Sequence, residues 1–380
     1  MPGLYETLTE DQEMILATVR DLAKDKIAPR AAEIDKTGEF PWDIIELYRE
    51  TGILSLPIPE EYGGGGASEL TGCMVLEEIA KVCANSTHAL ADHWLGITPL
   101  MVAGNEEQKQ KYLTQMVTGL AAFSLTEPEA GSDAGGVQTK AVLDGDDYVL
   151  NGQKCFCTDG NEADFITIFA KTDPTAAGAR GLSAFIVEKK TPGLSIGKIE
   201  DQMGMRGTRA CEIILEDCRV PRENLLAKEG NGFRIAMQTL DRTRPIDAAL
   251  AVGIADGALA YAIDYAKERR QFGQPIAEFQ GIQFMLSDMA TELEAARQLV
   301  YKAAYVIDHG GPDPKLSAMS NYFATDMAVK VTNDAMQVLG GYGYMKDYPL
   351  EQKMRDARLL QIVEGTNQVQ RVVVARNLLA

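Results

Sequence analysis

The sequence has few of the residues that bind structural metals. It holds three histidines and six cysteines in 380 residues, and no two cysteines form a C-x-x-C pair. Because protein zinc sites draw on such residues at short spacings, no metal site is predicted. The thiols are expected to be reduced and packed in the interior.

Long apolar runs and basic charge are also missing. No uninterrupted apolar stretch reaches membrane-spanning length, and the first six residues show no basic region followed by an apolar segment, so no signal or transit peptide is expected. The formal net charge of −18 opposes nucleic acid and anionic membranes as partners. We therefore predict a cytoplasmic protein with no nucleic-acid or membrane partner.

Glycine-rich nucleotide loops are absent as well. No G-x-G-x-x-G lies between a strand-like and a helix-like segment, and no Gly-Lys-Ser/Thr follows the four glycines at 63–66. These absences exclude a Rossmann-type NAD site and a P-loop.

What is present is a change of hydrophobic period along a chain too long for a single core. Residues 1–122 follow helical spacing, residues 123–229 follow strand spacing, and residues 230–380 are helical again. The predicted fold is α+β and mainly α. It comprises an N-terminal helical domain, a middle antiparallel β domain and a C-terminal four-helix bundle.

Local signals support each of these parts. Thr9–Gln12 has the form of a capping box at a helix start. Asp144-Gly145 and Asn151-Gly152 are typical of hairpin turns between strands. Apolar residues at steps of three and four predict two bundle helices, the first with Ile282, Leu286, Met289, Leu293, Ala296 and Val300, and the second with Leu316, Met319, Phe323, Met327 and Val331.

Glu364 is the strongest candidate for a catalytic residue. It lies between two β-branched residues and a glycine, just before a helix-like run. A partly buried carboxylate on a fixed turn has a raised pKa and is a good proton acceptor. The alternative is an acid that only favours the positive end of the following helix.

The segment 123–133 is the strongest candidate for a ligand site. Small residues at Ala130, Gly131 and Ser132 let backbone N–H groups and a hydroxyl approach a polar or anionic ligand, and Thr126 adds a second hydroxyl. The alternative is a helix-to-strand turn, because turns favour the same residues.

Four motifs, in this order, resemble those of the acyl-CoA dehydrogenase family of flavoproteins. They are Leu-Thr-Glu-Pro-x-Ala-Gly-Ser-Asp at 125–133, Arg-x-x-Phe-Gly at 269–273, Gln-Val-Leu-Gly-Gly-Tyr-Gly at 337–343 and Ile-Val-Glu-Gly-Thr at 362–366. They span nearly the whole chain. The family also has the helical, β and helical order found above.

The resemblance implies that FAD is the cofactor and assigns residues to it. Phe156 stands where many relatives have tryptophan, so a smaller aromatic wall flanks the flavin. The positions of the β domain and of the base segment that match cofactor contacts are Phe123, Leu125, Thr126, Gly131, Ser132, Phe156, Thr158, Thr366 and Gln368.

Further positions match residues that reach the FAD of a neighbouring subunit in the family. They are Arg269, Phe272, Gln337 and Gly341, and Arg269 would supply charge to the pyrophosphate. This arrangement requires at least a dimer. The family is usually a dimer of dimers, so a homotetramer is expected.

The implied reaction is α,β-dehydrogenation of an acyl-CoA thioester to the trans-2-enoyl-CoA. Glu364 would remove the α-proton, the flavin would accept the β-hydride, and the Glu364 N–H would help to stabilise the enolate oxygen. An electron-transfer flavoprotein is the expected electron acceptor. The positions that match substrate contacts are Ser132, Asp241, Arg244, Val363 and Gly365.

Two positions depart from the family. Val363 stands where many relatives have tyrosine, which indicates a wider or less polar pocket for a branched or alicyclic acyl group; a neutral substitution explains it equally well. Asp92 lies in a segment that usually carries small or amide residues. It is interpreted as a second acid near the substrate, or alternatively as a solvent-exposed helix acid beside a core Trp94.

Two other function classes use the same fold. One is an oxidase in which oxygen reoxidises the flavin. The other is a DNA-associated or non-catalytic flavoprotein, and the acidic charge of the chain opposes the DNA role.

Overall fold

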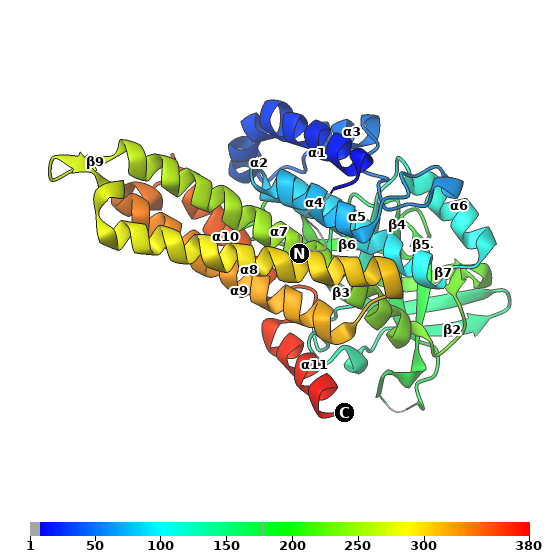
Figure 1. The fold of residues 1–380 in the computed structure, drawn as a ribbon. Helices are drawn as coiled ribbons and strands as arrows, with labels where there is room; N and C mark the ends of the chain where they lie inside the picture. Colours follow the sequence, from blue (N-terminus) through cyan, green and yellow to red (C-terminus); the bar gives the residue numbers. More distant parts are fainter. Residues whose placement is uncertain (1–7, 177) are drawn as a thin grey trace.

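The computed structural model describes residues 8–176 and 178–380. The first six residues, on which the prediction about a targeting peptide rests, lie outside the described residues. Long helices run from one end of the molecule to the middle, a sheet lies at the other end, and a layer of shorter helices covers one side (Figure 1).

The N-terminal part is helical, as predicted. The capping box at its start is confirmed, because Thr9 Oγ1 accepts the Gln12 N–H and the Gln12 side chain accepts the Thr9 N–H. The helices are α1 (Glu10–Leu22), α2 (Ala31–Thr37), α3 (Trp42–Glu50), α4 (Glu69–Ala80), α5 (Ala84–Ala103) and α6 (Glu106–Met116).

The β part forms one sheet in the strand order β6-β7-β3-β2-β4-β5-β8, with β1 also paired to β4. The prediction of an antiparallel domain needs a correction, since β4 pairs in parallel with both β1 and β2. The strands are β1 (Ala121–Ser124), β2 (Lys140–Asp144), β3 (Asp147–Thr158), β4 (Phe165–Lys171), β5 (Leu182–Glu188), β6 (Leu194–Ile199), β7 (Ala210–Pro221) and β8 (Leu225–Leu226).

Only one of the two predicted hairpin turns is a turn. Asp144-Gly145 connects β2 to β3, as predicted. Asn151-Gly152 instead lies inside β3, at a register shift opposite β7. A Cβ on Gly152 would come within 2.5 Å of Thr139 Oγ1, so glycine serves close packing here and not chain reversal.

The C-terminal part is a helical bundle. On α8 the predicted apolar positions from Met289 to Val300 are buried. On α9 the prediction that Phe323 faces the bundle core is wrong, because this ring is 38% exposed. The elements are α7 (Gly232–Glu268), a short hairpin of β9 (Arg270–Gln271) and β10 (Gln274–Pro275), α8 (Gln280–Gly310), α9 (Pro314–Leu339), α10 (Leu350–Leu360) and α11 (Asn367–Leu379).

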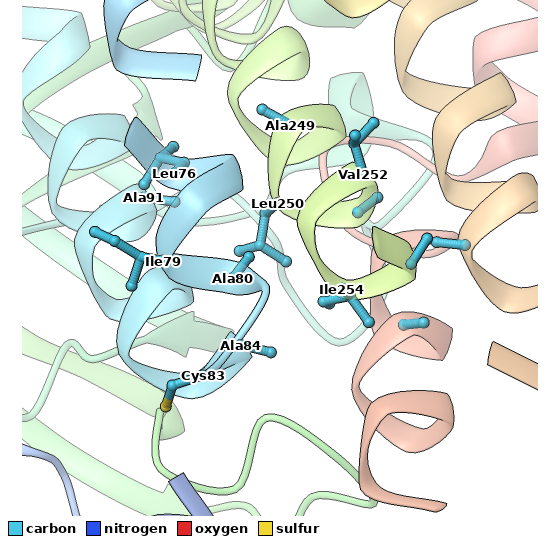
Figure 2. Close-up of a cluster of buried hydrophobic side chains, with 14 of the residues drawn as sticks. Leu76, Ile79, Ala80, Cys83, Ala84, Ala91, Ala249, Leu250, Val252 and Ile254 are labelled. Carbon is cyan, nitrogen blue, oxygen red and sulfur yellow. The ribbon is translucent and has the colours of Figure 1, made fainter. Parts of the chain in front are cut away.

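Helix α7 joins the two helical parts. Figure 2 shows side chains of α4, α5 and α7 meeting in one buried cluster that includes Leu76, Ala91 and Leu250. Cβ atoms added to Gly253 and Gly257 would lie 2.4 and 2.1 Å from backbone oxygens of α4, so these glycines permit the close contact. By length and composition α7 could span a membrane, yet 72% of its apolar window is buried in the protein, as in a core helix.

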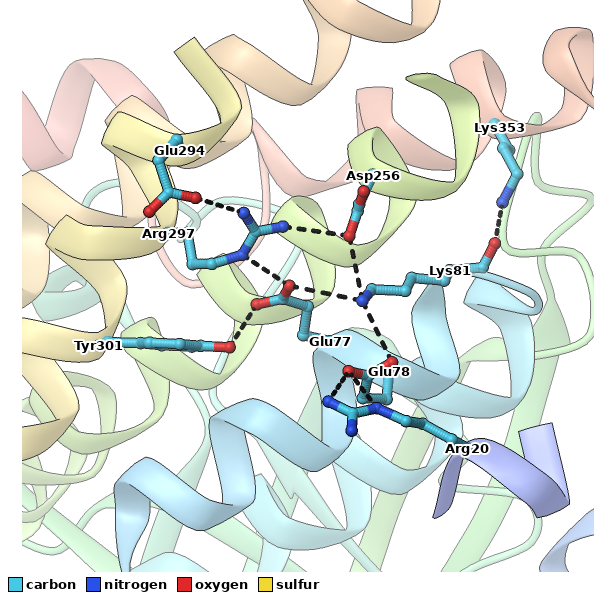
Figure 3. A network of polar contacts seen from close by, with 9 residues as sticks. All are labelled: Arg20, Glu77, Glu78, Lys81, Asp256, Glu294, Arg297, Tyr301 and Lys353. Carbon is cyan, nitrogen blue, oxygen red and sulfur yellow. Dashed lines mark hydrogen bonds and ion pairs between the residues drawn. The ribbon is translucent and has the colours of Figure 1, made fainter. Parts of the chain in front are cut away.

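A polar network ties α4 to the bundle beside this apolar contact (Figure 3). Buried Glu77 accepts hydrogen bonds from Arg297 Nε at 2.8 Å and from the Tyr301 hydroxyl at 2.7 Å. Arg297 also binds Asp256 at 3.1 Å, and Lys81 lies 3.1 Å from the same carboxylate. Because Glu77 is nearly inaccessible, losing it would leave the Tyr301 hydroxyl and the Arg297 Nε–H without their acceptor in the interior.

We expect Glu77→Ala to lower the free energy of unfolding by about 3 kcal/mol and the melting temperature by about 5 °C or more. Thermal unfolding followed by circular dichroism measures this. The matched control is Glu294→Ala, which removes the 54%-exposed partner of the same arginine and should cost at most about 1 kcal/mol. Equal losses in the two variants would contradict a special role for the buried carboxylate.

Candidate active site

Glu364 lies on a left-handed turn between α10 and α11. Its φ is +56°, followed by +88° at Gly365. A residue with a side chain adopts this conformation only where its surroundings hold it. Here Gln370 Nε2 donates to the carbonyls of Glu364 and Gly365, both at 2.8 Å, and Arg244 Nε donates to the Glu364 carbonyl at 3.3 Å.

The turn directs the Glu364 carboxylate into the protein. Its Oε2 accepts the Thr243 hydroxyl at 3.0 Å, and Thr366 is the residue that caps α11. The alternative interpretation of Glu364 as a helix-start acid is therefore wrong. Among the described residues the Glu364 N–H has no acceptor, so a free backbone donor accompanies the carboxylate.

Burial raises the pKa of Glu364 to about 8, and the nearby Asp247 is the second cause. The positive charge of Arg244 and the hydrogen bond from Thr243 act in the opposite direction. A carboxylate with a raised pKa is a stronger base than a solvated one. The geometry thus pairs a strong proton acceptor with a hydrogen-bond donor.

Asp92 belongs to the same group of acids. Its side chain is 15% exposed, so the interpretation as a solvent-exposed acid is wrong. His88 Nδ1 lies 3.0 Å from Asp92 Oδ2, but burial lowers the pKa of His88 to about 4, so this ring is neutral near pH 7. Burial, followed by the charges of Asp159, Asp247 and Glu364, raises the pKa of Asp92 well above its usual range.

The residues after Asp92 are structural. Trp94 is buried, as expected, and its Nε1–H donates to the Leu54 carbonyl at 2.9 Å. His93 Nδ1 accepts the Ala121 N–H at 3.2 Å, and burial lowers the pKa of His93 to about 3. The His93 bond fixes α5 against β1, and the Trp94 bond holds α5 to the loop that follows α3.

The ligand-type segment at 125–133 is held by a buried ion pair. Lys154 Nζ donates to Glu127 Oε1 at 2.7 Å and to the Leu125 carbonyl at 3.1 Å. Glu127 also accepts the N–H groups of Gln138 and Thr139. Because Lys154 is in β3, the pair fixes this segment beside the strand that carries Phe156.

The predicted contacts in the β domain form an open surface next to this pair. Phe156 is 63% exposed, with a φ of +54°, and a Cβ on Gly131 would meet no atom within 4 Å. Ser132 is exposed, while Thr126 and Thr158 are half-buried. Leu125 and Phe123 pack inward, so only their backbones are available to a ligand.

The predicted contacts in the bundle lie elsewhere. Arg269 stacks on Tyr342 at 5.5 Å beside a cavity of about 490 Å³ that Gly341 also lines. Phe272 is 95% exposed and Gln337 is exposed. This bundle tip, next to β9, lies at the opposite end of the molecule from the sheet (Figure 1). The structure therefore does not bring the two predicted sets together within one chain.

Three residues near Glu364 were not predicted from the sequence. Gln370 and Thr243 bond to Glu364, and no motif singled them out. Asp247 is a lone acid in the apolar run 245–252 of α7, and that isolation was the available signal. Arg244 was expected at the substrate, and the structure places its guanidinium against Asp241 at 2.6 Å and the Glu364 carbonyl.

Family models match the chain in three consecutive blocks. The N-terminal, middle and C-terminal domain models of acyl-CoA dehydrogenase match residues 9–120, 122–218 and 230–379. This order of helical, β and helical parts defines an FAD-dependent dehydrogenase fold.

Individual relatives agree with this class. Cyclohex-1-ene-1-carbonyl-CoA dehydrogenase of Syntrophus aciditrophicus is 48% identical, over 98% of this chain and 91% of its own. The structure of butyryl-CoA dehydrogenase from Megasphaera elsdenii has a TM-score of 0.96 at 44% identity, covering 98% and 99% of the two chains. A chain in a structure described as the electron transferring flavoprotein of Acidaminococcus fermentans is 50% identical, with a TM-score of 0.96 and the same coverage. The chain belongs to the acyl-CoA dehydrogenase family.

Removing the buried lysine should loosen the flavin surface. In Lys154→Met the Glu127 carboxylate stays buried without its cation, which costs roughly 3–5 kcal/mol. We expect the purified variant to retain markedly less flavin per chain, as measured by absorbance. The control is Lys198→Met, which removes a largely exposed lysine of the same domain and should leave flavin content unchanged. Full flavin retention in Lys154→Met would contradict this role of the ion pair.

Proposed function

We propose that this protein oxidises a short-chain or alicyclic acyl-CoA to the 2-enoyl-CoA, with Glu364 as the base that removes the α-proton. The observation that carries the proposal is the half-buried Glu364 carboxylate, which accepts the Thr243 hydroxyl while Gln370 and Arg244 bond to the carbonyl of the same residue. The relatives from Syntrophus aciditrophicus and Megasphaera elsdenii, with their named alicyclic and butyryl substrates, support the acyl class.

The residues of this chain account for the proton step. Glu364 Oε1 is free of the Thr243 bond and accepts the proton from the α-carbon. The unpaired Glu364 N–H donates to the thioester oxygen as charge develops there. Arg244 donates to the carbonyl of the same residue, which helps to fix the turn that carries both the carboxylate and the N–H.

FAD is the cofactor that these residues suit. An exposed aromatic ring at Phe156 and an open glycine at Gly131 suit a flat ring system, and Thr126, Ser132 and Thr158 supply hydroxyls. Thr366 and Gln368 would complete the contacts near the base. When bound, FAD supplies the acceptor for the β-hydride.

The distal part of the cofactor would belong to a second subunit. Arg269, Phe272, Gln337 and Gly341 lie at the bundle tip, too far from the sheet to serve the same cofactor within one chain (Figure 1). We therefore infer a site shared between subunits of a cytoplasmic homotetramer. The similarity to a chain in the Acidaminococcus fermentans structure supports an electron-transfer flavoprotein as the electron acceptor.

The substrate contacts follow the same logic. Ser132 and Asp241 would bind the CoA arm, and Arg244 would position Asp241 through their 2.6 Å hydrogen bond. Val363 and Gly365 flank the base, and the small Val363 side chain leaves room for a branched or cyclic acyl group.

The base assignment is tested by anaerobic titration of the holoenzyme with straight, branched and alicyclic acyl-CoAs, following loss of flavin absorbance. Glu364→Gln should bleach at least about 1,000-fold more slowly, because the amide cannot accept the α-proton. Glu364→Asp, which keeps the carboxylate on a shorter side chain, should retain part of the rate. Bleaching of Glu364→Gln at the normal rate would refute the assignment, and failure of every acyl-CoA with the wild-type protein would refute the proposed function.

Asp92 is proposed as a second acid of the acyl pocket, because its side chain is only 15% exposed and the charge of Glu364 contributes to its raised pKa. We expect Asp92→Asn to slow turnover of alicyclic acyl-CoAs by about 10-fold or more, as removal of a general acid or base does. Butyryl-CoA, which has no carbon beyond γ, serves as the control substrate within the same variant. Unchanged rates with the entire panel would show that Asp92 is not functional.

A further inference from the structure

Three polar side chains form a column on one face of α7. Thr239, Thr243 and Asp247 are four residues apart, so they lie one above the other along the helix. They are 0, 2 and 7% exposed. The run that follows, 248–252, is wholly buried and apolar, so the column is the polar exception in a core helix.

The column begins at the catalytic turn. Thr243 Oγ1 lies 3.0 Å from Glu364 Oε2 and 3.3 Å from the Thr239 carbonyl. A hydroxyl has one proton, so Thr243 can donate to only one of these two acceptors at a time. One turn further, Asp247 extends the same polar face away from Thr243.

No cation compensates Asp247. Among the described residues, no ion pair or hydrogen bond to its carboxyl is present, and burial alone accounts for its raised pKa, which is about 7. The charged groups that act on it are acids: Asp92 on α5 and Glu364 on its turn. Asp92 in turn faces the neutral His88 and Asp159, which follows β3. Arg244, the nearest cation on α7, is already paired with Asp241. A buried carboxyl without a partner is costly, which indicates a functional reason for keeping it.

We propose that Asp247 is a positioning residue for the reaction, one that shares the negative charge of the pocket with Glu364 and thereby sets the pH at which the base becomes available. This inference rests on the proposed role of Glu364. Two neighbouring carboxyl groups that repel each other do not both ionise easily, so their protons leave in two steps that belong to the pair. Charge on Asp247 keeps the proton on Glu364 and makes Glu364 a stronger base once it is ionised.

The test compares pH profiles of flavin bleaching by the fastest acyl-CoA of the panel, from about pH 6 to about pH 9.5. In Asp247→Asn the rate should begin to rise at a pH about one unit lower than in the wild type, because the charge that repels the Glu364 carboxylate is gone. The limiting rate at high pH should fall and not rise, because a weaker base accepts the α-proton more slowly. Asp247→Glu should restore the wild-type profile.

Two further variants separate charge from packing. Asp247→Val removes the same charge with a side chain that suits the apolar helix, and should show the same shift where Asp247→Asn folds poorly. Thr239→Val removes a neutral polar group from the same column and should leave the pH of the rise unmoved. Profiles of Asp247→Asn and Asp247→Val that coincide with the wild type would overturn the proposal.

An infrared titration of the carboxyl C=O band in the holoenzyme gives a readout that needs no turnover. The band that disappears in Glu364→Gln identifies Glu364, and its titration should move to lower pH in Asp247→Val. If no acyl-CoA bleaches the flavin but this shift is seen, the proposed substrate class fails while the coupling of the two carboxyls stands. If bleaching occurs and the band titrates identically in both proteins, the coupling fails alone.

Discussion

The close packing of α7 against α4, α5 and α9 is the constraint on which the rest of the structure depends. Gly253 and Gly257 bring the backbone of α4 against α7, and a continuous apolar cluster fills the surrounding space (Figure 2). One consequence is that the N-terminal and C-terminal helices share a core. The network around Glu77 then adds directional bonds at the edge of that core, where charged groups still reach solvent (Figure 3).

The same helix holds Glu364, the proposed base, without an ion pair to its carboxylate. Thr243 binds the carboxylate and Arg244 binds the carbonyl of this one residue on the turn. The Arg244 guanidinium binds Asp241 and the Glu364 carbonyl, so it fixes the turn. Its charge lowers the pKa of Glu364, but less than burial raises it. Arg244 therefore orients Glu364 through its backbone carbonyl and forms no ion pair with its carboxylate.

The sequence predicted those features that depend on local pattern or on a shared motif. The change of period, the capping box at Thr9 and the turn at Asp144-Gly145 are local, and Glu364 was found through its motif and its position before a helix. The prediction of a turn at Asn151-Gly152 was wrong, because an Asn-Gly pair can also occur inside a strand. Here Gly152 allows the backbone to pack closely against Thr139. Asp92 and Asp247 lie on different helices, so their convergence on Glu364 is a tertiary fact that no window of sequence contains. The predicted domain limits at 122 and 229 stay predictions, since the apolar core continues across the helical parts.

The two predicted halves of the cofactor site differ in how they are supported by the rest of the chain. In the β domain the buried Lys154–Glu127 pair holds the 125–133 segment beside β3, the strand that carries Phe156. At the bundle tip, Arg269 and Phe272 stand on a short hairpin, and Phe272 is almost fully exposed. An aromatic ring so exposed gains stability only when a partner covers it. A cofactor site shared between subunits would therefore couple assembly to cofactor binding. The exposed bundle tip of each subunit would become buried when it completes the cofactor site of its neighbour.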